Sequence, residues 1–396
     1  MSHFTINPRR FQLICAPLLT FLEAAVTGQR SDWHTRKFTA KQHLLLTIFA
    51  HFAQAPSANA LLEELNEVVG LKRERNLRQL IGFDQLETDT NQLQLLNQSS
   101  FSRANAKRSY RLWHYCFGKL WQIAKPHCQP RHLAGLGQLV AVDGSLFECL
   151  GRMMWATYRT TSNKVRGHFF FDLAGLPDKL VLTNGKGSER QILREHLRPK
   201  VTFIFDRGYN DYALFAYATK IGAFFVTRPL SNAVFEVVLE RKVAATQMQR
   251  GVICDQNISL AVEGELTILR RVSFRDIEGN EWCYLTNRFD LDPLTIVQLY
   301  QYRWQIELFF WWIKRHLQLR HWYSECENGV LIQLYAALIA FVLLKLYSLH
   351  CGKAEFRQMH IDFVRWCQRH LFEPVQPTEI LAYLHLLDSD NENICT

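Results

Sequence analysis

Hydrophobic positions in the first third of the chain recur at the spacing of amphipathic helices. Apolar residues repeat every three or four positions in four segments, which are residues 11–26, 40–52, 58–69 and 110–123. This period places them on one face of a helix, and Ser57 stands where the N-cap of the third helix is expected. Prolines and glycines between residues 125 and 137 indicate a linker. The pattern therefore predicts an all-helical region over residues 1–130.

Beyond residue 137 the pattern changes to short apolar runs of strand length. These runs occupy residues 139–142, 167–173, 179–183, 201–205 and 223–227. Helical periodicity returns between them at residues 188–197 and 211–221. From residue 228 to 290 the strand pattern continues without an evident helix, as expected of a β-rich insertion. The pattern predicts an α/β fold.

Two of the apolar runs end in an aspartate that precedes a glycine-bearing turn. The sequences are VAVDGS around Asp143 and FIFDRGY around Asp206. Strands this apolar are expected to be covered on both faces. A charged carboxylate at the end of such a strand is destabilising unless something pairs with it. Asp143 and Asp206 are therefore candidate functional acids.

A third acid lies on a predicted helix with a polar stripe, YQYRWQIELFFWWIK. At about 100° per residue, Tyr300, Arg303, Glu307 and Lys314 share an arc of about 60°. The apolar residues that fall on an adjacent arc are Leu299, Ile306, Phe310, Ile313 and Leu317. A carboxylate at the rim of a core, with cations one turn away, suits phosphate chemistry. The alternative is a solvated face in which Arg303 and Glu307 form an ordinary i,i+4 ion pair.

Three carboxylates from two strands and a helix can together hold two divalent cations. Mg²⁺ prefers oxygen ligands, whereas Cys and His would favour zinc, and the ten cysteines contain no CxxC pair. Two ions about 3.5–4 Å apart would activate the attacking oxygen and stabilise the leaving oxygen of a phosphodiester displacement. Three other acids rank below this set, namely Asp172, Asp211 and Glu148.

The charge of the chain favours a polyanionic partner. The formal net charge is +9, which suits nucleic acid. Residues 101–132 contain no Asp or Glu, and cations there can lie along phosphates. The candidates in this segment are Arg103, Lys107, Arg108 and Arg111. A basic surface helix without a ligand is the alternative.

No segment is expected to cross a membrane or to direct secretion. The long apolar run at residues 329–349 is interrupted by Gln333 and Lys345 and is predicted to be a buried helix rather than a span. The N-terminal residues lack the shape of a signal peptide. A cytoplasmic location, at the bacterial nucleoid, is expected.

Together and in order, these motifs resemble DDE-type transposases of bacterial insertion sequences, in the insertion-sequence-four branch. That branch is known by Tyr, two residues, Arg, three residues, Glu, six residues and Lys. The chain matches this spacing at Tyr300, Arg303, Glu307 and Lys314. The VDGS and DRGY motifs also match, and the resemblance spans nearly the whole chain. The segment between Asp206 and Glu307 is shorter than in the best-known relatives.

The resemblance implies an RNase H-like catalytic core over residues 137–349, with the β-rich insertion at about 228–290. It implies a helical DNA-binding domain over residues 1–130 and a helical tail over 350–396. Asp143, Asp206 and Glu307 would bind two Mg²⁺ ions, for which Mn²⁺ can substitute. The implied reaction is cut-and-paste transposition, in which a freed 3′ hydroxyl forms a hairpin that is reopened before strand transfer.

The resemblance also implies DNA contacts for particular side chains. Tyr300, Arg303 and Lys314 would contact phosphates near the cut. Trp282 matches the place where related transposases stack a base, although a core tryptophan fits the pattern equally well. Lys164 and Arg166 could follow phosphates or could belong to a solvated loop.

Double-stranded DNA, as terminal inverted repeats and as target, is the expected partner, and the family assembles as a homodimer on two ends. Two other functions stay open from the residues alone. One is a metal-dependent DNA nuclease or resolvase on the same core. The other is a non-catalytic DNA-binding protein that retains the carboxylates.

Overall fold

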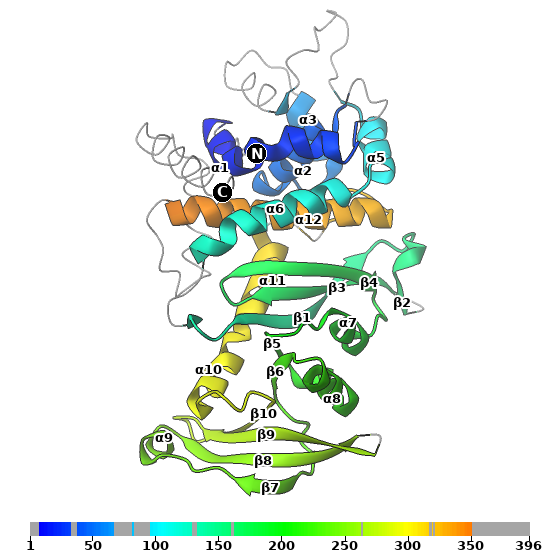
Figure 1. Ribbon diagram of the computed structural model, residues 1–396. Helices are drawn as coiled ribbons and strands as arrows, with labels where there is room; N and C mark the ends of the chain where they lie inside the picture. Colours follow the sequence, from blue (N-terminus) through cyan, green and yellow to red (C-terminus); the bar gives the residue numbers. More distant parts are fainter. Residues whose placement is uncertain are drawn as a thin grey trace, which may run out of the picture. The chain divides into compact units, whose positions relative to one another are not determined.

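The computed structural model divides the chain into two compact units (Figure 1). The first comprises Met1–His127, Glu148–Trp155 and Trp311–Thr396, and the second comprises Cys128–Phe147 and Ala156–Phe310. The residues that the structure describes are 8–32, 38–66, 81–82, 96–128, 133–159, 162–262, 264–316, 319 and 321–350. The tail predicted over 350–396 lies almost wholly outside them, and the predicted domain boundaries stay predictions.

The first unit is helical, as the spacing of apolar residues predicted. Its helices are α1 (Pro8–Gly28), α2 (Ala40–Phe52), α3 (Ala58–Asn66), α5 (Gln98–Lys107), α6 (Arg111–Cys128) and α12 (Glu327–His350). The Ala60 N–H donates to Ser57 Oγ at 3.1 Å, which confirms Ser57 as the cap of α3. In α2 every residue but Lys41 is buried, so this helix lies at the centre of the unit.

The basic segment forms two helices rather than one. Helix α5 ends at Lys107, and its N-cap is Asn97, whose Oδ1 accepts from the Ser100 N–H at 2.8 Å. The connection between α5 and α6 is stabilised by Asn328. Its Nδ2 donates to Arg108 O at 2.8 Å, and its Oδ1 accepts from the Tyr110 N–H at 3.1 Å. Helix α6 then continues through Pro126 to Cys128, because a proline removes only its own N–H from the last turn.

Helix α12 packs against α2, α1 and α5. Both α12 and α1 are long and apolar enough to cross a membrane by length and composition. In α12, however, 89% of the most apolar window is buried within the protein. Since core helices pass the same test, this is weak evidence for a span, and the burial agrees with the predicted core helix.

The second unit is built on a ten-stranded mixed sheet in the order β2-β3-β1-β5-β6-β10-β9-β8-β7, with β4 paired to β3. The central strands β1, β5 and β6 are parallel, and the pairs from β6 and β10 outward to β7 are antiparallel. The fold is therefore mixed α/β. The strands are β1 (Gln138–Cys149), β2 (Thr157–Arg159), β3 (Ser162–Asp172), β4 (Leu176–Asn184), β5 (Val201–Phe205), β6 (Phe224–Thr227), β7 (Glu236–Glu240), β8 (Val252–Val262), β9 (Glu265–Arg275) and β10 (Glu281–Thr286).

Both faces of the central strands are covered. On one face, β1, β5 and β6 share a core with α7 (Glu189–His196) and α8 (Tyr212–Lys220). Phe170 of β3 belongs to this core. Its neighbours alternate to the other face, where the Phe169 ring lies 5.1 Å from Phe310 and the Phe171 ring lies 5.0 Å from Phe309. Both partners lie in α11 (Trp304–His316), so this packing anchors the helix that carries Glu307.

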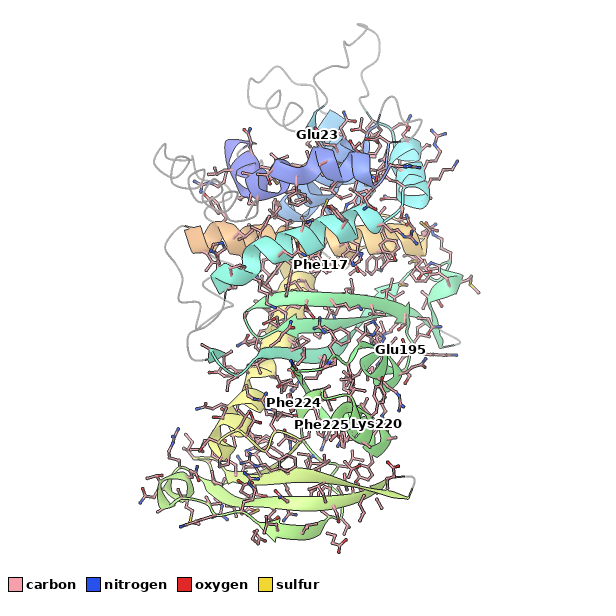
Figure 2. All side chains as sticks on the ribbon, in the orientation of Figure 1. Glu23, Phe117, Glu195, Lys220, Phe224 and Phe225 are labelled. Carbon is pink, nitrogen blue, oxygen red and sulfur yellow. The ribbon has the colours of Figure 1, made fainter. Side chains whose placement is uncertain are left out.

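Strand β6 shows the same alternation in Phe224 and Phe225, which are labelled in Figure 2. Phe225 is fully buried, and its ring lies 4.6 Å from that of Phe215 in α8. The Phe224 ring instead lies 4.7 Å from the Arg288 guanidinium. Successive residues of β6 therefore point to opposite faces of the sheet.

Three details of the second unit differ from the sequence pattern. Strand β1 continues past Asp143 to Cys149, because polar residues can extend a strand once its apolar part is paired. A short helix, α9 (Ala245–Gln249), interrupts the insertion, where none was predicted. The predicted single helix is divided into α10 (Pro293–Tyr302) and α11. At the division, the Arg303 N–H donates to Tyr300 O and the Ile306 N–H donates to Arg303 O, so that each bond spans three residues instead of four.

Candidate active site

The parallel pairing of β1 and β5 brings the two predicted aspartates side by side. Its last paired residues are Val142 and Phe205, and Asp143 and Asp206 follow them directly. Asp143 Oδ1 accepts from the Gly144 N–H at 2.8 Å. Asp206 caps the short helix η3 (Arg207–Tyr209), where its Oδ1 accepts from the Gly208 N–H at 2.8 Å.

The two carboxylates repel one another. Burial raises the pKa of Asp143 to about 6, and the charges of Asp206 and Glu189 add to the rise. The Gly144 N–H and the Arg303 guanidinium act in the opposite direction. A raised pKa means that the ionised form is under-stabilised, and a cation between the two carboxylates would relieve this.

Glu307 lies in the first turn of α11, where it is held by Arg303. The Arg303 Nη2 donates to Glu307 Oε1 at 2.6 Å, so the i,i+4 ion pair considered from the sequence is present. Burial alone would lower the pKa of Arg303, but the bond to Glu307 and the charges of Tyr300, Glu307 and Asp143 raise it. The guanidinium therefore interacts with both Glu307 and Asp143.

Asp143, Asp206 and Glu307 do not together form a set of metal ligands in the structure. Within the described part of the chain, no three Asp, Glu, His or Cys side chains group so as to hold a metal ion. The donors at the strand ends nevertheless suit a hard divalent cation, because they are carboxylate oxygens whose charge is only partly compensated. Glu307 would have to exchange its bond to Arg303 for a place beside the aspartates.

Tyr300 lies at the end of α10, with its ring 5.2 Å from the Tyr284 ring and 5.6 Å from the Arg303 guanidinium. Burial raises the pKa of Tyr300, while the charges of Arg303 and Arg228 oppose the rise. Two arginines therefore act on one phenol near the acids, which is a suitable setting for a phosphate.

Trp282 is half-buried rather than part of the core. Its Nε1 donates to Asp276 Oδ2 at 2.8 Å, and the Arg228 guanidinium lies 4.4 Å from the ring centre. The indole is thus fixed in place by one hydrogen bond and one cation–π contact. Arg228 follows β6 directly and is not part of any motif in the sequence, so pattern reasoning missed it.

A further acid, Glu189, was also missed. It is the first residue of α7 and forms an ion pair with Arg166 of β3. Arg166 was predicted either to follow DNA phosphates or to belong to a solvated loop, and the structure pairs it with this carboxylate. An acid in the first turn is common in helices because it suits the helix dipole, so Glu189 carried no signal of its own in the sequence.

The remaining predicted DNA contacts occupy different settings. Arg103, Lys107 and Arg111 are exposed on α5 and α6. Arg108 is only 9% exposed, donates to Phe38 O at 2.6 Å and lies 3.7 Å from Asp32, which gives it a role in the fold. Lys164 lies on β3 with its Nζ 5.9 Å from the Tyr158 ring.

Lys314 lies seven residues beyond Glu307 in α11 and is half-buried. The division between the two compact units falls inside this helix, after Phe310. Of the three lower-ranked acids, Asp211 is the N-cap of α8, where its Oδ1 accepts from the Ala213 N–H at 2.9 Å.

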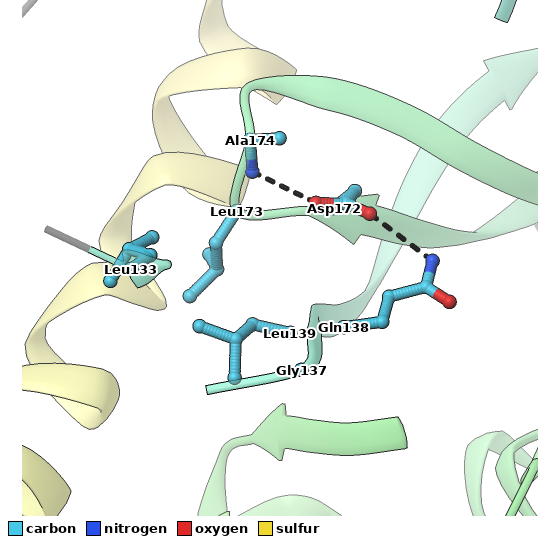
Figure 3. A pocket seen from close by; sticks show the side chains of 7 residues that line it. All are labelled: Leu133, Gly137, Gln138, Leu139, Asp172, Leu173 and Ala174. Carbon is cyan, nitrogen blue, oxygen red and sulfur yellow. Dashed lines mark hydrogen bonds between the residues drawn. The ribbon is translucent and has the colours of Figure 1, made fainter. Parts of the chain in front are cut away.

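A small pocket lies at the beginning of β1, lined by residues that include Gln138, Leu139 and Asp172 (Figure 3). Asp172 accepts from the Ala174 N–H at 2.9 Å and from Gln138 Nε2 at 3.1 Å, so the turn explains this acid. Asp143 is four residues beyond Leu139, about 13 Å along a strand at 3.3 Å per residue. The pocket is therefore separate from the acids.

Several known transposases are similar to this chain. The family described as "Transposase DDE domain" matches residues 135–343, just over half of the chain. A putative transposase, y4zB, from Sinorhizobium fredii is 32% identical over 256 residues, which cover 63% of this chain and 71% of that protein. A probable transposase for insertion sequence element IS5377 from Geobacillus stearothermophilus is 28% identical over 221 residues, or 54% of this chain and 58% of that protein.

Among solved structures, a piggyBac transposase synaptic complex with hairpin DNA aligns with 99% of this chain and 86% of that chain. The sequence identity is 12% and the TM-score 0.44, a similarity too weak to establish a shared fold. The family match and the first relative confirm the resemblance drawn from the motifs. The chain belongs to the DDE transposase family.

Proposed function

We propose that this protein is a cut-and-paste transposase that cleaves DNA at the ends of an insertion sequence and joins the freed ends to a target. The observation that carries the proposal is the pair of aspartates at the end of the parallel β1–β5 pairing. Asp143 and Asp206 follow the last paired residues, Val142 and Phe205, and the ionised form of Asp143 is under-stabilised there. The parallel β1, β5 and β6, with α7 and α8 packed on them, support an RNase H-like core.

In this proposal Asp143, Asp206 and Glu307 are the catalytic carboxylates. They would hold two Mg²⁺ ions, for which Mn²⁺ can substitute, and these ions would supply the charge that activates the attacking oxygen and stabilises the leaving oxygen. Binding requires Glu307 to leave Arg303. The released guanidinium, with its planar pair of donors, is then available to a DNA phosphate.

Tyr300 and Lys314 would contact phosphates near the cut, and Trp282 would stack a base displaced when a hairpin forms. An indole fixed by Asp276 and Arg228 is suited to stacking because it loses little freedom when a base arrives, and one stacked base contributes about 1–3 kcal/mol. The substrates are terminal inverted repeats and target DNA. We further propose a homodimer on two paired ends that works at the nucleoid in the cytoplasm.

The test incubates the purified protein and Mg²⁺ with DNA that carries the two flanks of its own gene. Nicks, hairpins and joined strands are the expected products. Replacement of Asp143, Asp206 or Glu307 by Ala should lower the cleavage rate by about 1,000-fold or more and leave end binding in a gel-shift assay unchanged. Glu195→Ala, which removes an exposed acid from α7, should cleave at the wild-type rate.

The products separate the proposal from its alternatives. Cleavage without strand joining would identify a nuclease or resolvase on the same residues. Binding that is independent of divalent cations, with no cleavage at all, would identify a DNA-binding protein. Full cleavage activity in the Ala variants would remove the three acids from the mechanism.

A further inference from the structure

Tyr209 has a buried hydroxyl that lacks a hydrogen-bond partner among the described residues. The residue ends η3, three positions after Asp206, and is 1% exposed. No described residue hydrogen-bonds to its hydroxyl. Its ring packs on Phe205 at 5.8 Å. Phenylalanine would fill the same volume without leaving a buried polar group unsatisfied, so packing alone does not account for the oxygen.

The surroundings of this hydroxyl are acidic. Burial raises the pKa of Tyr209, and the carboxylates of Glu189, Asp143 and Asp206 raise it further, while Arg166 opposes them. Three carboxylates therefore act on one phenol. The phenol therefore stays protonated, and its O–H is able to donate to a neighbouring carboxylate.

Glu189 and Arg166 form the second part of the same cluster. Their ion pair is shielded, with side chains 26% and 19% exposed. Glu189 lies so close to the backbone next to Asp143 that a Cβ at Gly144 would collide with its Oε1. The Nε of Arg166 is buried and, among the described residues, also lacks a partner. Two unsatisfied donors thus lie beside the aspartates.

Helix α7 is in turn tied to the turn that carries Asp206. The Nε of Arg190, next to Glu189, donates to Gly208 O at 3.3 Å. The beginning of α7 therefore lies against β1 next to Asp143 through Glu189 and contacts the turn after β5 through Arg190. Because it contacts the backbone near both aspartates, the beginning of α7 can fix the distance between Asp143 and Asp206.

We propose that Tyr209 and the Arg166–Glu189 pair are positioning residues that hold Asp143 and Asp206 for cation binding, with the Tyr209 hydroxyl donating to one of these carboxylates in the cation-bound protein. The proposal rests on the proposed function, because it concerns the same carboxylates. Outer hydrogen bonds of this kind orient ligating carboxylates and raise metal affinity.

The experiment measures the binding of Mn²⁺ alone to the full chain by isothermal titration calorimetry, without DNA. Tyr209→Phe and Glu189→Gln should each raise the dissociation constant about 10-fold, as is typical for the loss of an outer partner. The matched control is Tyr217→Phe, which removes a phenol oxygen from α8, where the ring lies under Arg194 at 4.4 Å. It should bind Mn²⁺ as the wild type does.

Urea unfolding in the presence of a chelator supplies the second readout. Tyr209→Phe should be as stable as the wild type or more stable, because the hydroxyl it lacks is unsatisfied in the metal-free fold. A loss of metal-free stability in this variant, or wild-type Mn²⁺ affinity in both Tyr209→Phe and Glu189→Gln, would overturn the inference.

Two further outcomes separate this inference from the proposed function. If the wild type binds no Mn²⁺, or if Asp143→Ala binds it as well as the wild type does, the proposed function fails and the inference fails with it. If the wild type binds and Asp143→Ala does not, while the Tyr209 and Glu189 variants bind normally, only the inference fails.

Discussion

At the scale of single residues, the second unit contains ionisable groups whose pKa is shifted by burial, one of them half-buried and the other fully buried. Asp143 responds with a pKa raised to about 6, and His168 with a pKa lowered to about 4. The directions differ because burial disfavours the charged form, which is the base form of a carboxyl and the acid form of an imidazole. We propose a catalytic role for Asp143, whereas His168 is part of the fold.

His168 predicts how stability depends on pH. It is 1% exposed on β3, and its Nε2 lies 2.8 Å from Thr183 Oγ1. Burial lowers its pKa, and the charges of Arg166 and His196 add to the effect. His168 takes up a proton below pH 6.5 in the unfolded chain but only near pH 4 in the folded protein. Its contribution to stability is therefore fully present above pH 6.5 and is lost as the pH falls toward 4.

Between pH 7 and pH 5 this one group should lower the free energy of unfolding by about 2 kcal/mol. Urea unfolding at the two pH values measures the difference. In His168→Gln the difference should shrink by that amount, and in His321→Gln, which alters an exposed histidine, it should not. An equal pH response in His168→Gln and the wild type would show that the imidazole titrates normally.

At the scale of elements, the outer strands are joined to α10 by one buried arginine. Arg270 of β9 is 1% exposed and donates to both oxygens of Asp255 in β8, at 2.8 and 2.7 Å. It also donates to Arg288 O and to Leu291 O, at 2.9 and 2.7 Å, in the connection that leads to α10. The helix before Arg303 is therefore positioned by the β-rich insertion.

Asp255→Ala should destabilise the protein by about 3–5 kcal/mol, because it leaves a buried guanidinium without its carboxylate. The control is Glu281→Ala, which breaks the exposed pair with Arg275, whose side chains are 61% and 56% exposed. Exposed pairs contribute about 0–1 kcal/mol. Urea unfolding measures both variants, and similar losses in the two would mean that Arg270 finds other acceptors.

At the scale of the whole molecule, the net charge of +9 and the family suggest that DNA binding is strongly salt-dependent. Each phosphate contact steepens the decrease of affinity with salt by about 0.9 on a log–log scale for duplex DNA. Only cationic side chains at the surface can contact phosphates. The predicted DNA-binding residues differ in how exposed they are. Arg103 and Lys107 are exposed on α5, whereas the side chain of Arg108 is only 9% exposed beside Phe38 and Asp32.

Arg103→Ala with Lys107→Ala should flatten the salt dependence of end binding by about two contacts, and Lys314→Ala by about one. Arg108→Ala should leave the slope unchanged and lower stability instead. Fluorescence anisotropy with labelled end DNA at several salt concentrations gives the slopes. An unchanged slope in the double variant would remove α5 from the DNA interface.

Periodicity and local motifs were sufficient to predict the elements whose boundaries depend on their own residues. Strand β5 begins and ends at Val201 and Phe205 as the apolar run indicates, and the boundaries of α2 match residue for residue. Asp206 was recognised because an acid directly after such a run is costly wherever the strand lies. Propensity and burial act along the chain, so a linear pattern carries this information.

Contacts between distant segments decided the rest. The break between α5 and α6 depends on Asn328, more than 200 residues away, and the neighbours of Asp143 depend on which strand pairs with β1. Glu189 and Arg228 carry no local signal, because one is an ordinary first-turn acid and the other an arginine after a strand. By itself the sequence determined the elements and the family, and it supplied candidates for the catalytic acids. Only the tertiary structure decided which groups surround them, because side-chain electrostatics act through space rather than along the chain.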